Sequence, residues 1–97
     1  MECMNKLRAM DILQSLWEIV RDNKCAMDEL REDFELRRRP CCAIRKNAKQ
    51  SIERINLAYG RFIRISEAYG FDEDYSVIPK TENLYMASVN LALFFGV

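Results

Sequence analysis

Residues 5–39 form a long stretch of this sequence that contains no glycine and no proline. At about 100° per residue, its apolar positions keep one phase along the whole stretch and form a single stripe. The stripe consists of Met10, Leu13, Leu16, Trp17, Val20, Met27, Leu30 and Phe34. This pattern predicts one continuous helix over about 5–39. A break near Asn23–Cys25 into two shorter helices is the alternative.

Pro40 is expected to end this helix, because proline disfavours helical geometry in the residue that precedes it. A second helical pattern runs over about 41–69 and stops at Gly70, since glycine commonly follows the last turn of a helix. Its apolar face comprises Ile44, Ala48, Ile52, Ile55, Tyr59, Phe62 and Ile63. The two helices are therefore predicted to form a long antiparallel hairpin.

The last third of the chain predicts a loop over 70–80 and a helix over about 82–95, with Thr81 as its N-cap. Apolar residues surround the axis of this helix almost completely, so it is expected to be buried on most sides. A strand over 88–95 is the alternative, because a short apolar run fits either structure. Residues 1–97 are thus predicted to form a single all-α domain, a three- or four-helix bundle. The chain itself or a homodimer through this C-terminal helix would complete the bundle.

The basic residues gather in the middle of the chain. Residues 37–64 contain nine of the fifteen lysines and arginines and one acidic residue, Glu53, which gives this segment a net charge of +8. The segments on either side each carry −4, so the whole chain is neutral. This charge block is the strongest indication of a binding partner in the sequence.

Ion pairs across the predicted hairpin would neutralise part of this block. The first helix carries acids near its end and the second carries bases near its start, and the helix macrodipole disfavours both. These residues are Asp28, Glu32 and Glu35 on the first helix and Arg45, Lys46 and Lys49 on the second. Antiparallel pairing would compensate both groups at once, so ion pairs between the two helices are expected.

A mixed set of residues on the outer face of the second helix extends beyond the reach of this pairing. The set is Lys46, Arg54, Leu57, Arg61 and Arg64. Lys46 belongs to it because the pairing mainly accounts for Arg45 and Lys49. We interpret these as the partner-binding residues. Basic groups beside an exposed leucine suit an acidic protein surface better than a phosphate backbone.

The residues needed for common catalytic and metal sites are absent from this sequence. It contains no histidine, and therefore neither the usual general base near neutral pH nor a histidine metal ligand. It also lacks a glycine-rich phosphate loop and a serine elbow. Cys3, Cys25, Cys41 and Cys42 do not have the spacing of a disulfide framework or a zinc site, so they are interpreted as reduced thiols. A redox or metal role for Cys41–Cys42 is the alternative. No catalytic residue, metal or cofactor is predicted.

These observations favour a non-enzymatic protein-interaction module, such as a small inhibitor, adaptor or accessory subunit. Its partner would be a larger protein with an acidic surface. The alternative is a nucleic-acid-binding regulator that contacts phosphates through the same basic helix. Membrane-surface binding is a weaker third hypothesis. The longest apolar run, Leu91–Phe95, is far shorter than the roughly 20 residues that a membrane span requires. The N-terminal residues do not resemble a signal peptide, so a cytoplasmic location is expected.

Overall fold

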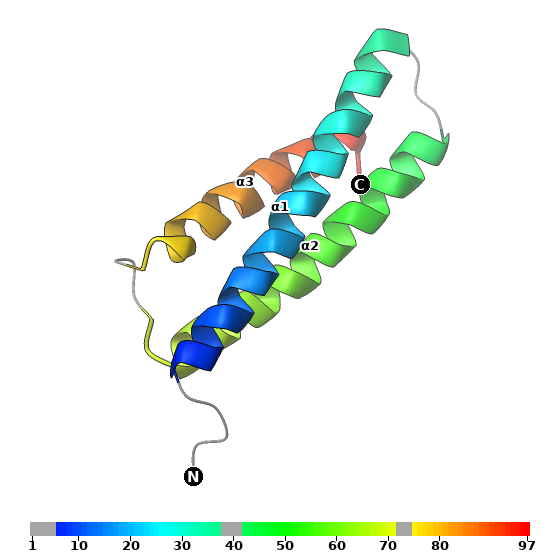
Figure 1. Ribbon diagram of the computed structural model, residues 1–97. Helices are drawn as coiled ribbons and strands as arrows, with labels where there is room; N and C mark the ends of the chain where they lie inside the picture. The colour runs from blue at the N-terminus through cyan, green and yellow to red at the C-terminus, as the bar shows by residue number, and fades with distance from the viewer. Residues whose placement is uncertain (1–5, 38–41, 72–74) are drawn as a thin grey trace.

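The computed structural model describes residues 6–37, 42–71 and 75–97, which form three helices. Helix α1 spans Lys6–Arg37, α2 spans Cys42–Ala68 and α3 spans Val77–Phe95. Figure 1 shows α1 and α2 running antiparallel, with α3 packed along one side of the pair. The predicted all-α bundle is confirmed. The alternative of a strand over 88–95 is wrong, since α3 covers these residues.

Helix α1 is continuous through its middle, so the alternative break near Asn23–Cys25 is wrong. The side chain of Asn23 does not interrupt the backbone, because its Nδ2 donates to the carbonyl oxygen of Ile19 at 2.8 Å, one turn back. One residue later, Lys24 Nζ donates to Asp28 Oδ2 at 2.6 Å, an i,i+4 pair that supports the helix. Both polar residues at the suspected break therefore bond within helical geometry.

Helix α2 ends where the sequence predicts. Gly70 adopts a left-handed φ of 71°, which glycine reaches without steric cost. The N–H of Phe71 then donates to the carbonyl oxygen of Ser66 at 2.9 Å, as in a Schellman motif. This contact satisfies a carbonyl at the end of α2 and turns the chain toward α3.

Helix α3 begins at Val77, five residues before the predicted start, so Thr81 is not its N-cap. Pro79 is the third residue of the helix, where a missing N–H costs nothing because first-turn N–H groups have no partner inside the helix. Thr81 instead lies in the core, fully buried, and its Oγ1 donates to the carbonyl oxygen of Val77 at 2.7 Å. Pro79 is thus part of the helix rather than of the loop before it.

The core lies where the three helices meet and contains most of the predicted apolar stripes. Its buried hydrophobic residues are Leu13, Leu16, Val20, Met27, Ile44, Ala48, Ile52, Ile55, Ala58, Phe62, Val77, Leu91, Ala92 and Phe95. Phe34 of α1 holds the end of α3 through edge-on ring contacts with Phe94 at 5.4 Å and Phe95 at 6.4 Å between centroids. These contacts fix α3 against the α1 side of the hairpin.

The outer side of α3 does not match its predicted burial on most sides. Met86 and Leu93 are 55% and 71% exposed, and Val89 between them is half-buried. α3 therefore buries one face against the hairpin and leaves the other to solvent. The predicted homodimer through α3 stays a prediction.

Two stacked tyrosines join α2 to α3, and the raised pKa of one of them predicts a loss of stability at high pH. The rings of Tyr59 and Tyr85 stack with centroids 4.1 Å apart. The pKa of the Tyr59 hydroxyl is raised above its usual value. Burial is the largest cause, followed by the negative charge of Glu82 and by Tyr85.

Because the unfolded chain then releases this proton first, the free energy of unfolding falls as the pH rises above about 10, the ordinary tyrosine pKa. In Tyr59→Phe, residue 59 cannot ionise. The Tm of this variant is therefore expected to fall less than the Tm of the wild type between about pH 9 and pH 11. Thermal unfolding followed by circular dichroism at both pH values measures this difference. An equal loss of Tm in the two proteins would contradict it.

Candidate protein-binding groove

A shallow groove runs between α1 and α2, and none of its lining residues comes from α3. We call it the arginine groove. It has a volume of about 450 Å³ and is lined by Leu16, Ile19, Arg54, Leu57, Ala58, Arg61 and Arg64. Apart from the adjacent Leu57 and Ala58, the residues from α2 follow one another at spacings of three or four, which is one helix face. The arginine groove is therefore a direct product of the amphipathic pattern of α2.

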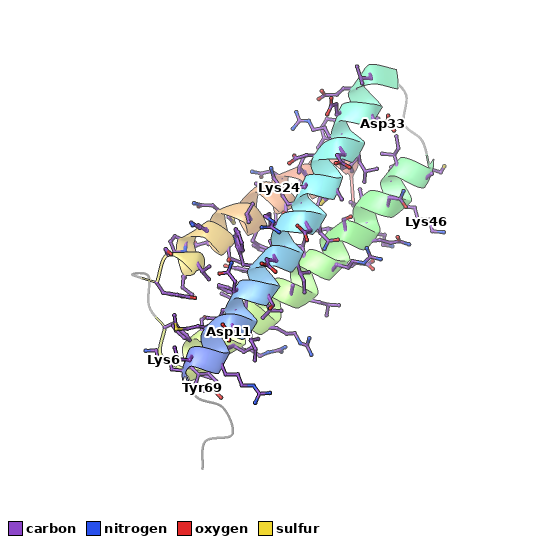
Figure 2. The ribbon with its side chains drawn as sticks, viewed as in Figure 1. Lys6, Asp11, Lys24, Asp33, Lys46 and Tyr69 are labelled. Atoms are coloured by element: carbon purple, nitrogen blue, oxygen red, sulfur yellow. The ribbon has the colours of Figure 1, made fainter. Side chains whose placement is uncertain are left out.

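Four of the five predicted partner-binding residues, Arg54, Leu57, Arg61 and Arg64, line the arginine groove together. Lys46 does not. It lies near the start of α2 (Figure 2), in a separate hollow of about 500 Å³ that it shares with Arg45, Lys49, Gly96 and Val97. Arg54 follows Lys46 by eight positions, which corresponds to about 12 Å along the helix at about 1.5 Å per residue. The structure thus divides the predicted set into two surfaces.

The arginine groove combines exposed apolar surface with basic side chains that form no ion pair among the described residues. Leu57 is 73% exposed and Ile19 is 43% exposed. Within the part of the chain that the structure describes, Arg54, Arg61 and Arg64 form no ion pair or hydrogen bond. A hydrophobic centre beside three unpaired guanidinium groups is suited to contact with another macromolecule.

The prediction of ion pairs across the hairpin is wrong for two of the three acids. Asp28 pairs with Lys24 at 2.6 Å and Glu35 pairs with Arg31 at 3.0 Å, each within α1. A basic residue four positions away on the same helix lies within reach of each carboxylate. The ion pair therefore forms within α1 rather than between the helices.

The bases at the start of α2 instead line one hollow with the C-terminal end of α3, where the guanidinium of Arg45 lies beside Gly96. The carbonyl groups at a helix C-terminus carry partial negative charge, which favours this placement of bases. The position of α3 therefore explains the charge of Arg45, Lys46 and Lys49 better than the predicted pairing does.

A second hollow continues the arginine groove along the same seam, with acidic residues on its α1 side. We call it the acidic hollow. It has a volume of about 550 Å³ and is lined by Ala26, Glu29, Leu30, Asp33, Asn47, Gln50, Ser51 and Arg54. Arg54 belongs to both hollows, so the two form one open face of the α1–α2 pair. Glu29 and Asp33 are not among the residues predicted from the sequence, although the regular spacing of Asp11, Asp22 and Asp33 could have indicated an acidic stripe.

The thiols and carboxylates of the described residues form no cluster of three or more that could hold a metal ion. Cys25 and Cys42 are free and exposed, so they are not the small core residues that their type favours. Cys3 and Cys41 lie outside the described residues. No helix in the described ranges is long and apolar enough to cross a membrane.

Comparison of the chain with known protein families, curated proteins and solved structures returns no match.

Proposed function

We propose that this chain is a non-enzymatic protein-interaction module that binds a protein partner through the open face of α1 and α2. The observation that carries the proposal is the arginine groove, where exposed Leu57 and Ile19 lie beside three arginines that have no partner among the described residues. A helix of the partner, with an apolar stripe and acidic residues on one side, would cover the leucine and neutralise the arginines. A module of this kind acts as an inhibitor, adaptor or accessory subunit.

A protein partner is favoured over nucleic acid by the acids on the same face. Glu29 and Asp33 line the acidic hollow next to Arg54, and a phosphate backbone laid along the seam would approach both carboxylates. The side chain of the exposed leucine also has no charge or hydrogen-bond donor that could bind a phosphate. Nucleic-acid binding stays the second candidate, because Arg54, Arg61 and Arg64 share one helix face, as phosphate-contacting residues do.

We further propose a cytoplasmic setting for this module. The free, exposed thiols of Cys25 and Cys42 support it, because thiols persist in reducing compartments and pair in oxidising ones.

Two triple variants with identical charge changes test the proposed binding face. The first replaces Arg54, Arg61 and Arg64 by glutamate; the control replaces Arg45, Lys46 and Lys49 by glutamate. We expect a tagged wild-type chain to retain a specific protein from its host, the groove variant to lose it and the control to keep it. The physical reason is that only the first set lies beside the exposed leucine. Quantitative mass spectrometry of the retained proteins measures the difference.

Retention of the same proteins by the groove variant would contradict the proposal, as would the absence of any reproducible partner. Loss by the control variant alone would move the site to the hollow around Lys46. For the nucleic-acid candidate, labelled single- and double-stranded DNA and RNA are titrated at low salt. Binding with a log–log salt slope of about 0.9 per phosphate contacted would favour that candidate instead.

A further inference from the structure

The open face carries opposite charges on its two helices. Asp11, Asp22 and Asp33 are spaced eleven residues apart, which is close to three full turns at about 3.6 residues per turn. They therefore share one side of α1, and Asp33 fixes that side as the one lining the acidic hollow. Figure 2 shows Asp11 and Asp33 toward opposite ends of α1. Thus α1 presents an acidic stripe beside the basic stripe of Arg54, Arg61 and Arg64 on α2.

The two stripes are also matched in height along the helix axes. The lining of the arginine groove is centred between Leu16 and Ile19 on α1 and close to Ala58 on α2, so Ile19 and Leu57 lie at about one level. Because the helices are antiparallel, Asp22 and Arg54, each three residues from this pair toward the same end, lie at one level. By the same count Asp11 and Arg64 lie within about one residue, or 1.5 Å, of one level.

We infer that the partner of the open face is a second copy of this chain, bound face to face about a twofold axis parallel to the helices. This inference rests on the proposed function in taking the open face as the contact surface. A uniformly acidic partner would be repelled by α1 and a uniformly basic one by α2. A second copy turned about this axis places its α2 over α1 and its α1 over α2, so every acidic stripe meets a basic one.

The register of the stripes selects this orientation. A twofold axis parallel to the helices preserves height, so Asp22 of one copy meets Arg54 of the other, and Asp11 meets Arg64. A twofold axis across the helices would instead lay α1 on α1, acid against acid. The same rotation places the Ile19 of each copy over the Leu57 of the other, which buries both exposed side chains at the centre.

The groups required for these contacts are available, and the face is large enough. Asp22 bonds Arg21 through Oδ1 at 3.1 Å, which leaves Oδ2 without a partner within the described ranges, and its side chain is 68% exposed. A rectangle of the molecule's two longest dimensions, 54 Å by 22 Å, exceeds the roughly 800 Å² per partner that stable interfaces bury, so the dimer requires contact over most of one long side. The outer side of α3, with Met86 and Leu93, offers apolar surface without a charge pattern to set a register.

Swapping charges between copies tests this arrangement. Wild type, Asp22→Arg and Arg54→Asp are compared by sedimentation equilibrium, where the monomer mass is 11.4 kDa. Wild type is expected at twice that mass. Each single variant is expected to self-associate at least about tenfold more weakly than the wild type, because both symmetric contacts become repulsive. An equal mixture of the two variants is expected to regain association, because in the mixed dimer both contacts again join opposite charges.

Arg45→Asp is the matched control, since it makes the same substitution on α2 but lies beside Gly96 and away from the open face. It is expected to associate as wild type does. Circular dichroism and the emission of Trp17 verify that each variant is folded.

A wild-type mass of 11.4 kDa at the highest soluble concentration would overturn the inference. So would a dimer that neither variant weakens, which would point to α3, or a mixture that fails to recover. Retention of a host protein that depends on Arg54, Arg61 and Arg64, by a chain that sediments as a monomer, would overturn the dimer and leave the proposed function standing.

Discussion

Replacing Asn23 by proline is expected to lower the free energy of unfolding by about 3 kcal/mol or more. Asn23 lies at the middle of α1, where proline would remove the backbone bond to Ile19 and press its ring against that carbonyl group. The side-chain bond from Nδ2 to the same carbonyl oxygen, at 2.8 Å, would be lost as well. Since domains of this size unfold at a cost of only about 5–15 kcal/mol, the variant should be largely destabilised. Chemical denaturation followed by far-UV circular dichroism measures the effect.

Two controls separate the backbone effect from the loss of the side chain. Asn23→Ala removes the Nδ2 bond but keeps the helix, and alanine favours helix more strongly than asparagine, so the stability should change by less than about 1 kcal/mol. Leu7→Pro introduces proline into the first turn of α1, where N–H groups lack an intrahelical partner, and should cost far less than Asn23→Pro. If Asn23→Pro were as stable as Asn23→Ala, α1 would not be one continuous helix in solution.

The bounds of α1 and α2 could be predicted to within two residues because strong local signals determine them. The apolar stripe of residues 5–39 keeps one phase, and Gly70 supplies the left-handed residue that ends α2. The start of α3 could not be predicted as well. Pro79 was interpreted as a loop residue that precedes the helix, whereas the first turn accepts proline without loss of a hydrogen bond. Composition alone does not distinguish these two placements.

The candidate site was predictable on one helix only. Arg54, Leu57, Arg61 and Arg64 follow helical spacing, so their common face is a property of the sequence. Lys46 has the same phase but lies two turns away, beside the end of α3, and helical periodicity carries no information about that neighbour. The acidic side of the open face was missed for a related reason. Which side of α1 stays uncovered depends on where α3 packs, and α3 was expected to be buried on most sides.

Replacing the buried Leu13 by alanine is expected to lower the free energy of unfolding by about 3 kcal/mol, within a usual range of 2–5. Leu13 has an exposed fraction of 0% and belongs to the cluster where the three helices meet, so alanine would leave a cavity that close packing cannot fill. For a domain of this length that corresponds to a fall in Tm of roughly 12–24 °C. Leu7→Ala is the matched control on the same helix, because Leu7 is 72% exposed and should lose less than about 0.5 kcal/mol. Thermal and urea unfolding of the two variants measure the difference, and equal losses of stability would mean that Leu13 is not buried in the core.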